Sequence, residues 1–156
     1  LCEFSRAPIG ICLRLYPVSV AEPRNTILIV DDEENILSLM AETLRLVGFA
    51  TETASRGADA VSKIRSEKID LVLLDINMPK KNGFEVLAEI RADKHLRDIP
   101  VVMLTTSKQE SDILRAYDIG ACSFIAKPVN FESMRHIAHH FALYWTAVAN
   151  VPHRPA

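Results

Sequence analysis

The sequence has few cysteines, almost no net charge and no long hydrophobic run. Its 156 residues include only Cys2, Cys12 and Cys122, an odd number without a Cys-x-x-Cys pair. A disulfide framework or a zinc site is therefore not expected, and a cytoplasmic location suits the chain. The net charge of −2 gives no reason to expect direct binding to nucleic acid or to an anionic membrane. No segment approaches the roughly 18 consecutive apolar residues that a membrane span needs.

Length and composition indicate one globular domain. The chain is 49% hydrophobic and 24% charged, as is usual for such domains. Residues 1–24 contain three prolines and show no helical or strand periodicity, so we predict a disordered N-terminal extension. A secretory signal core in residues 9–20 is the alternative, although Arg14 interrupts it. The domain is predicted to span residues 25–150, followed by a tail of residues 151–156.

Short apolar segments alternate with amphipathic ones along this domain. Strands are expected at residues 27–30, 49–53, 71–74, 101–104 and 123–126. A helix is expected after each strand, because apolar residues recur there at helical spacing, among them Ala58, Val61 and Ile64. Five β–α pairs with short connections predict a parallel sheet with helices on both faces. The fold class is therefore α/β, a single doubly wound, five-stranded parallel sheet with five helices.

Polar side chains follow four of the expected strands. Asp31 and Asp32 follow the first strand, Asp75 the third, Thr105 the fourth and Lys127 the fifth. An isolated Asp after a strand is usually a turn residue. In a parallel sheet, however, the carboxyl ends of all strands meet at one edge, where ligands bind. We therefore expect these five side chains to converge on one pocket.

The residue types in this pocket indicate phosphoryl chemistry. Three carboxylates brought together raise one another's pKa values unless a cation lies among them, and oxygen ligands favour Mg²⁺. Lys127 adds a positive charge and Thr105 a hydroxyl, whereas no His, Cys or Ser follows a strand in a triad-like arrangement. A divalent ion, a lysine and a hydroxyl around Asp75 would make that carboxylate a phosphoryl acceptor.

Five short motifs occur in order along the chain. They are Val30-Asp31-Asp32, Leu74-Asp75-Ile76-Asn77-Met78-Pro79, Asn82-Gly83, Leu104-Thr105-Thr106-Ser107 and Lys127-Pro128. In this order and spacing they resemble the receiver (CheY-like) domain of two-component response regulators, over residues 26–147. The resemblance implies a flavodoxin-like sheet with strand order 2-1-3-4-5. It also implies that Asp75 takes a phosphoryl group from the phosphohistidine of a sensor histidine kinase or phosphotransfer protein.

The same resemblance implies a role for each matching residue. Asp32 and Asp75 would bind Mg²⁺ directly, together with the backbone carbonyl of Asn77, while Asp31 would act largely through water. Thr105 would contact a phosphoryl oxygen after transfer.

Lys127 would contact another phosphoryl oxygen, and the Lys127–Pro128 bond is expected to be cis. Phe124 stands where the family has its switch aromatic, often Tyr, so the ring is kept without the hydroxyl. Thr105 and Phe124 are therefore the expected switch residues.

Signal output is expected through a protein surface. We expect a stand-alone regulator, not a turnover enzyme, that contacts a downstream protein through Tyr117, Phe124 and the last helix. A narrower resemblance to regulators paired with bacterial phytochrome-type kinases points to a homodimer.

Two alternative functions remain open. The chain could be a pseudo-receiver that only binds proteins, or a Mg²⁺-dependent phosphohydrolase, although Asn77 stands where the latter needs a carboxylate. Elsewhere, Cys122 is expected in the core. His136, His139 and His140 are expected on a solvated helix face, with a shared metal as the alternative.

Overall fold

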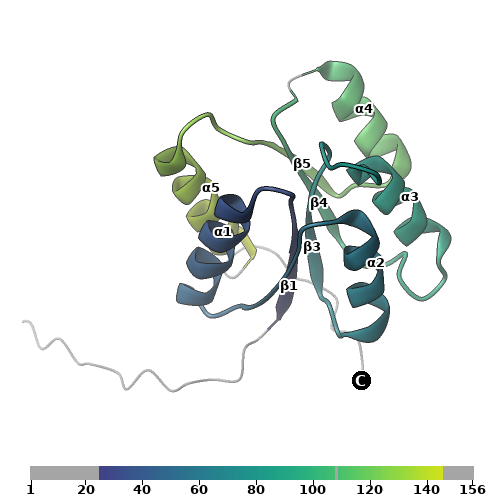
Figure 1. Cartoon of the computed structure of the whole chain (residues 1–156), viewed down its shortest axis with the longest axis horizontal. Coiled ribbons are helices and arrows are strands. Elements are labelled where there is room, and N and C mark those ends of the chain that lie inside the picture. The colour runs from purple at the N-terminus through teal and green to yellow at the C-terminus, as the bar shows by residue number, and fades with distance from the viewer. Residues whose placement is uncertain (1–24, 108, 146–156) are drawn as a thin grey trace, which may run out of the picture.

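The computed structural model describes residues 25–107 and 109–145, which form alternating strands and helices (Figure 1). The strands are β1 (Thr26–Val30), β2 (Ala50–Ala54), β3 (Leu71–Asp75), β4 (Val101–Thr105) and β5 (Ser123–Ala126). The helices are α1 (Glu34–Leu46), α2 (Gly57–Ser66), α3 (Gly83–Ala92), α4 (Glu110–Ile119) and α5 (Phe131–Leu143). The predicted N-terminal extension, the signal alternative and the predicted tail lie outside the described residues.

All strand pairs in the sheet are parallel, and the strand order is β2-β1-β3-β4-β5. Helices α1 and α5 cover one face of the sheet, and α2, α3 and α4 cover the other (Figure 1). The predicted α/β fold, with its doubly wound, flavodoxin-like strand order, is confirmed. This order places the ends of β1 and β3 side by side at the centre, and those of β4 and β5 beside them.

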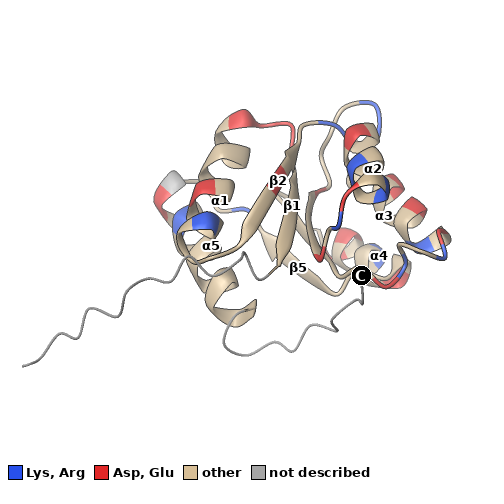
Figure 2. Cartoon of the chain, turned by 90° about the horizontal axis from the view of Figure 1, so that it is seen from below, with Lys and Arg blue, Asp and Glu red and all other residues tan. Residues whose placement is uncertain are grey.

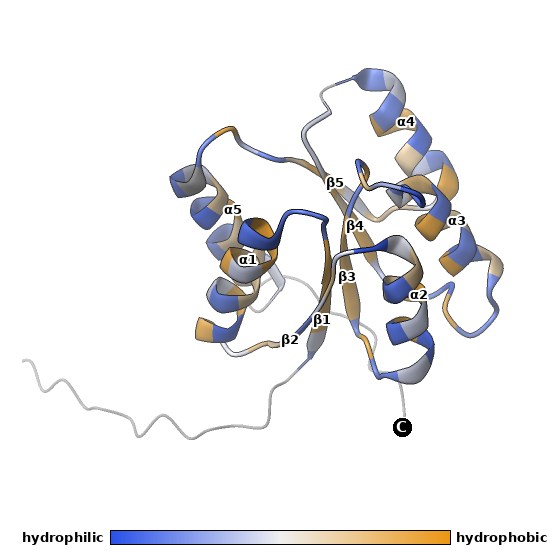
Figure 3. Ribbon diagram, viewed as in Figure 1, coloured by the Kyte–Doolittle hydropathy of each residue, from blue (hydrophilic) through white to orange (hydrophobic). Residues whose placement is uncertain are grey.

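Burial follows directly from the strand sequences. Every residue of β3 and β4 is buried, as expected for apolar runs with helices on both faces. In the edge strands β2 and β5, the residues at most positions are only partly buried. Apolar colour in Figure 3 is accordingly concentrated on the central strands and the inner helix faces. The central strands of the sheet are thus fully enclosed, and their carboxyl ends lie at one edge where reactive groups can gather.

Charged residues of both signs are distributed over the helices and loops, and the strands are mostly uncharged (Figure 2). Within the described ranges, no helix has the length and apolar composition that crossing a membrane would require.

Three local expectations are wrong. Ala58 is exposed and Ala60 is buried, because α2 begins at Gly57 and its inner face falls on residues 57, 60, 61 and 64. Cys122 is exposed, since it immediately precedes the edge strand β5. The Lys127–Pro128 bond is trans, like every peptide bond in the described part of the chain. Trans remains the lower-energy form before proline, by about 0.5–1 kcal/mol.

Arg91 of α3 connects three segments on the α2–α3–α4 side of the sheet. Its Nε donates to the carbonyl oxygen of Gly120 at 2.9 Å, just after α4. Its Nη1 donates to the carbonyl oxygens of Arg97 at 3.0 Å and Ile99 at 2.9 Å, in the connection to β4. Burial lowers the pKa of the guanidinium, although nearby negative groups partly oppose that shift. One side chain therefore satisfies three main-chain acceptors.

Replacing Arg91 with methionine should lower the free energy of unfolding by about 2 kcal/mol, because carbonyl groups lose their donor while the apolar stem is kept. Urea denaturation of the full chain would measure the change. Arg97→Met is the matched control, since that exposed side chain only approaches Asp98 at 4.0 Å, and its loss should cost less than about 0.5 kcal/mol. Equal losses in the two variants would contradict the role assigned to Arg91.

Candidate functional site

Three carboxylates converge at the carboxyl edge of the sheet. Asp31 and Asp32 follow β1, and Asp75 is the last residue of β3. One carboxylate oxygen from each residue lies within 4.8 Å of the others. Asp31 and Asp75 are buried, and Asp32 is exposed, so the cluster opens to solvent on one side. The predicted convergence of these carboxylates is confirmed.

Lys127 reaches into the same cluster from the residue after β5. Its Nζ lies 2.5 Å from Oδ2 of Asp31 and 3.1 Å from Oδ2 of Asp75, and its side chain is almost fully buried. Its backbone N–H donates to the carbonyl oxygen of Thr105 at 2.6 Å, which continues the β4–β5 ladder by one residue. Strand pairing therefore fixes the backbone position of Lys127, and the ion pairs with Asp31 and Asp75 fix the position of its ammonium group.

The charges in the cluster shift one another's titration. Burial raises the pKa of Asp31 to about 6, although hydrogen bonding to Lys127 opposes this shift. Burial also raises the pKa of Asp75, again against the attraction of Lys127. Burial alone would lower the pKa of Lys127, but its hydrogen bond to Asp31 and the charge of Asp75 outweigh that effect and raise it. The positive charge of Lys127 therefore does not fully offset the effect of burial on the pKa values of Asp31 and Asp75.

The carboxylate cluster fits a hard divalent cation. The Oδ1 atom of Asp75 is buried and accepts no hydrogen bond from any residue that the structure describes. An unpaired buried carboxylate oxygen is costly, and a cation would compensate it. The donors are all oxygens and include the solvent-facing Asp32, which suits an ion such as Mg²⁺ that retains several waters.

The side chain of Asn77 crosses from the β3–α3 loop to the end of β4. Its Nδ2 donates to Oγ1 of Thr106 at 3.1 Å and lies 3.5 Å from Oγ1 of Thr105. The hydroxyl of Thr105 is fully buried and also accepts from the backbone N–H of Ser107 at 3.1 Å. The predicted residues Asn77 and Thr105 are thus brought together beside Asp75.

Two further residues at this edge were not assigned a main role from the sequence. Thr106 receives the hydrogen bond from Asn77, and Oε1 of Glu33 lies 3.7 Å from Nζ of Lys127. Both border a depression of about 360 Å³ beside the cluster, together with the fully exposed Val129. In the sequence, the only sign of their place at the site is that Glu33 directly follows Asp32 and Thr106 directly follows Thr105.

Gly83 brings the start of α3 against the end of β3. A Cβ on Gly83 would overlap the carbonyl oxygen of Asp75 and come within 2.9 Å of Cα of Ile76. Asn82 precedes it as the N-cap, and its side chain and that of Glu85 form a capping box. The structure thus uses the Asn-Gly pair as a helix cap followed by a close backbone approach.

The other highlighted residues lie away from the cluster. Phe124 is half-buried against the core on the α2–α4 side, and Tyr117 of α4 is exposed. The histidines of α5 are exposed as expected, and within residues 25–107 and 109–145 only the Asp31, Asp32 and Asp75 group has metal-ligand spacing.

Comparison with known proteins identifies the family that the sequence motifs resemble. The family model described as response regulator receiver domain matches residues 27–139. The chain is 39% identical over 102 residues to the alkaline phosphatase synthesis transcriptional regulatory protein PhoP of Bacillus subtilis, covering 65% of this chain and 42% of that protein. It is 40% identical over 104 residues to the CpxR homolog of Haemophilus influenzae, covering 67% and 44%. The chain therefore spans less than half the length of these relatives.

Solved structures agree over a longer part of the chain. The phosphorylated cyanobacterial phytochrome response regulator RcpA has a TM-score of 0.78 at 35% identity, covering 83% of this chain and 99% of that one. The Mn²⁺-bound form of response regulator Rcp1 has a TM-score of 0.77 at 29% identity with the same coverage. With the family model covering most of the folded part, the chain belongs to the response regulator receiver domain family.

Proposed function

We propose that this receiver accepts a phosphoryl group on Asp75 from the phosphohistidine of a sensor histidine kinase or a phosphotransfer protein. The observation that carries the proposal is the buried Asp75 carboxylate, which has one oxygen paired with Lys127 and the other without a partner among the described residues. A nucleophilic oxygen therefore lies beside the ammonium group of Lys127. Receiver domains are signalling domains, and the family membership of the chain supports this reading.

In the proposed transfer, a carboxylate oxygen of Asp75 forms a bond to phosphorus while the phosphorus–nitrogen bond of the donor breaks. The electron pair of that bond leaves with the imidazole, and the product is an aspartyl phosphate. The ammonium group of Lys127, already 3.1 Å from Asp75, would stabilise a phosphoryl oxygen.

The residues proposed to hold Mg²⁺ are Asp31, Asp32 and Asp75, with the backbone carbonyl of Asn77 as a further ligand. Asp32 and Asp75 would bind directly and Asp31 largely through water. When bound, the ion would neutralise charge on the phosphoryl oxygens.

Activation is proposed to act through Thr105 and Phe124. The buried Thr105 hydroxyl is bonded to the N–H of Ser107 and lies near Asn77, and a phosphoryl group on Asp75 would offer it a stronger acceptor. Movement of Thr105 would leave space behind it for the half-buried ring of Phe124. The exposed Tyr117 and α5 would then present an altered surface to a downstream protein or to a second copy of the chain.

Other parts of the proposal stay predictions. We predict that the protein is a stand-alone regulator, that it is located in the cytoplasm, and that it does not bind nucleic acid or membranes directly. The relatives named above are transcriptional regulators more than twice as long as the matched region. The RcpA and Rcp1 chains, by contrast, are covered almost completely.

Intact mass measurement with acetyl phosphate and Mg²⁺ would test the proposal. We expect a gain of one phosphoryl group that disappears when a chelator is added, and peptide mapping should place it on the segment containing Asp75. A folded protein that binds Mg²⁺ but gains no mass with any small donor would contradict it and favour the pseudo-receiver. Sustained release of phosphate over many turnovers would favour the phosphohydrolase.

A further inference from the structure

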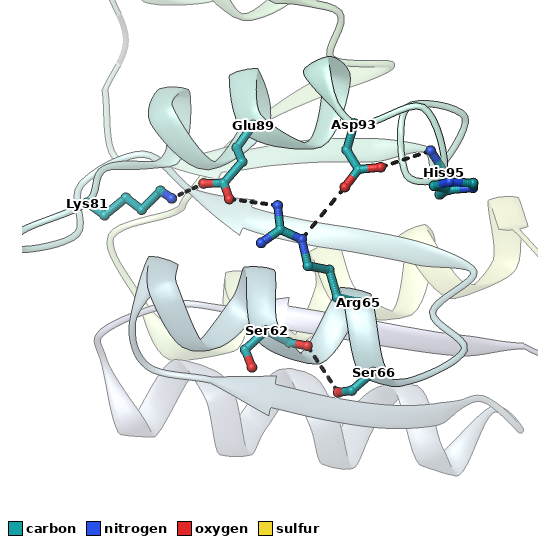
Figure 4. A network of polar contacts seen from close by, with 7 residues as sticks. All are labelled: Ser62, Arg65, Ser66, Lys81, Glu89, Asp93 and His95. Atoms are coloured by element: carbon teal, nitrogen blue, oxygen red, sulfur yellow. Dashed lines mark hydrogen bonds and ion pairs between the residues drawn. The ribbon is translucent and has the colours of Figure 1, made fainter.

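A chain of ion pairs on the surface joins α2, α3 and the loop between β3 and α3 (Figure 4). Lys81 Nζ contacts Oε2 of Glu89, and the other oxygen of Glu89 lies 3.1 Å from Nη2 of Arg65. Nε of Arg65 lies 3.7 Å from Asp93. Hydrogen bonding to Lys81 lowers the pKa of Glu89. These four residues are called the α2–α3 ion-pair chain below.

Lys81 belongs to the loop that carries Asn77. This loop, residues 76–82, is compact, because the N–H of Lys81 donates to the carbonyl of Pro79 at 2.8 Å and that of Gly83 to the carbonyl of Ile76 at 3.0 Å. Lys80 has a φ of 68°, a left-handed conformation that disfavours side chains with a Cβ. A loop with this conformation needs contacts from outside to hold it.

The first residue of α2 supplies a second, apolar contact to the same loop. A Cβ on Gly57 would lie 2.8 Å from the carbonyl oxygen of Lys81 and 3.2 Å from its Cβ, so glycine allows the helix to approach this closely. The Lys81 backbone is therefore packed against α2, while its side chain is bound to α3.

From these contacts we propose that Lys81 and Glu89 are positioning residues for the metal site. By holding Lys81, the α2–α3 ion-pair chain would fix the path of residues 76–82 and hence the backbone carbonyl of Asn77. This inference rests on the proposed function, since it assumes that Asn77 contributes a ligand. Neither Lys81 nor Glu89 lies in the carboxylate cluster itself.

A charge effect and a positioning effect predict opposite results for Lys81. Removing a positive charge near a cation site should strengthen Mg²⁺ binding by simple electrostatics. Releasing the loop should weaken it, because the Asn77 carbonyl would no longer be held in place. Lys80 is the matched control, since it is the adjacent lysine and its exposed side chain makes no hydrogen bond or ion pair with any residue in the described ranges.

Calorimetric titration of the full chain with Mg²⁺ alone would separate these effects. Lys81→Met should raise the dissociation constant about two- to fivefold, the range of one partly exposed ion pair. Glu89→Gln should also weaken binding, and Lys81→Arg, which keeps the charge and the donor, should restore it. Lys80→Met should bind as tightly as the parent or tighter. A Lys81→Met protein that behaves like Lys80→Met would overturn the proposal.

Amide hydrogen exchange without metal provides a second readout. In Lys81→Met the amides of Lys81 and Gly83 should exchange faster than in Lys80→Met, because the turns they close are less well held. Unchanged exchange would also overturn the proposal. If the parent binds no Mg²⁺, the proposed function fails and this inference fails with it. If the parent binds Mg²⁺ and accepts a phosphoryl group, a null result for Lys81→Met removes only the positioning role.

Discussion

Replacing Asp75 with asparagine should abolish phosphoryl transfer and at the same time stabilise the metal-free protein. The amide has no nucleophilic carboxylate oxygen, so intact mass should show no phosphoryl gain. Burial raises the pKa of Asp75, which means that its charged form costs the folded state free energy at neutral pH, where the unfolded chain is ionised. Removing that charge should raise the free energy of unfolding, measured by urea denaturation with a chelator present.

Asp118→Asn is the matched control, because it makes the same chemical change at an exposed position on α4. That variant should be phosphorylated like the parent, and its free energy of unfolding should change by less than about 0.5 kcal/mol. A less stable Asp75→Asn protein would mean that the attraction of Lys127 outweighs the cost of burying the carboxylate.

Replacing Gly83 with alanine should destabilise the fold strongly and disturb the acceptor. The new methyl group would overlap the backbone of Asp75 and approach Ile76, and neither can rotate away as a side chain could. We expect a loss of about 3 kcal/mol in the free energy of unfolding, despite the better helix propensity of alanine. Phosphorylation by acetyl phosphate should also slow, since the backbone that carries the nucleophile must shift.

Gly48→Ala distinguishes this clash from the general cost of losing a glycine. Gly48 has a φ of 99° but no atom within 4 Å of an added Cβ. The substitution should therefore cost about 1 kcal/mol through backbone strain alone, and leave phosphorylation unchanged. If the two variants lose the same stability, the close approach of α3 to β3 does not restrict residue size at Gly83.

The fold could be predicted from the sequence because its signals are local. Apolar runs of four residues marked the three central strands, and the residues immediately after them marked the carboxyl edge. Convergence of Asp31, Asp75 and Lys127 then followed from the parallel sheet alone. The errors came where a short segment permits several solutions, as with the face of α2 at Ala58 and the position of Cys122 beside an edge strand.

Long-range side-chain contacts could not be predicted in this way. Arg91 and Arg65 read as ordinary surface residues of amphipathic helices, and nothing in their neighbours along the chain names their partners. Their partners depend on how helices pack side by side, which periodicity does not report. The bond from Asn77 to Thr106 is similar, because it depends on the distance between two loops. The switch role of Phe124 rests on the resemblance to the family and stays a prediction.

The short edge strand β5 has a consequence for how the protein would lose function. It has four residues, pairs on one side only, and is followed directly by Lys127. Edge strands open by local fluctuations at a lower free energy than the central strands do. Heat or denaturant would therefore withdraw the lysine while β1 and β3 still hold the three carboxylates in place. We expect competence for phosphorylation to disappear at milder conditions than the native far-ultraviolet circular dichroism of the domain.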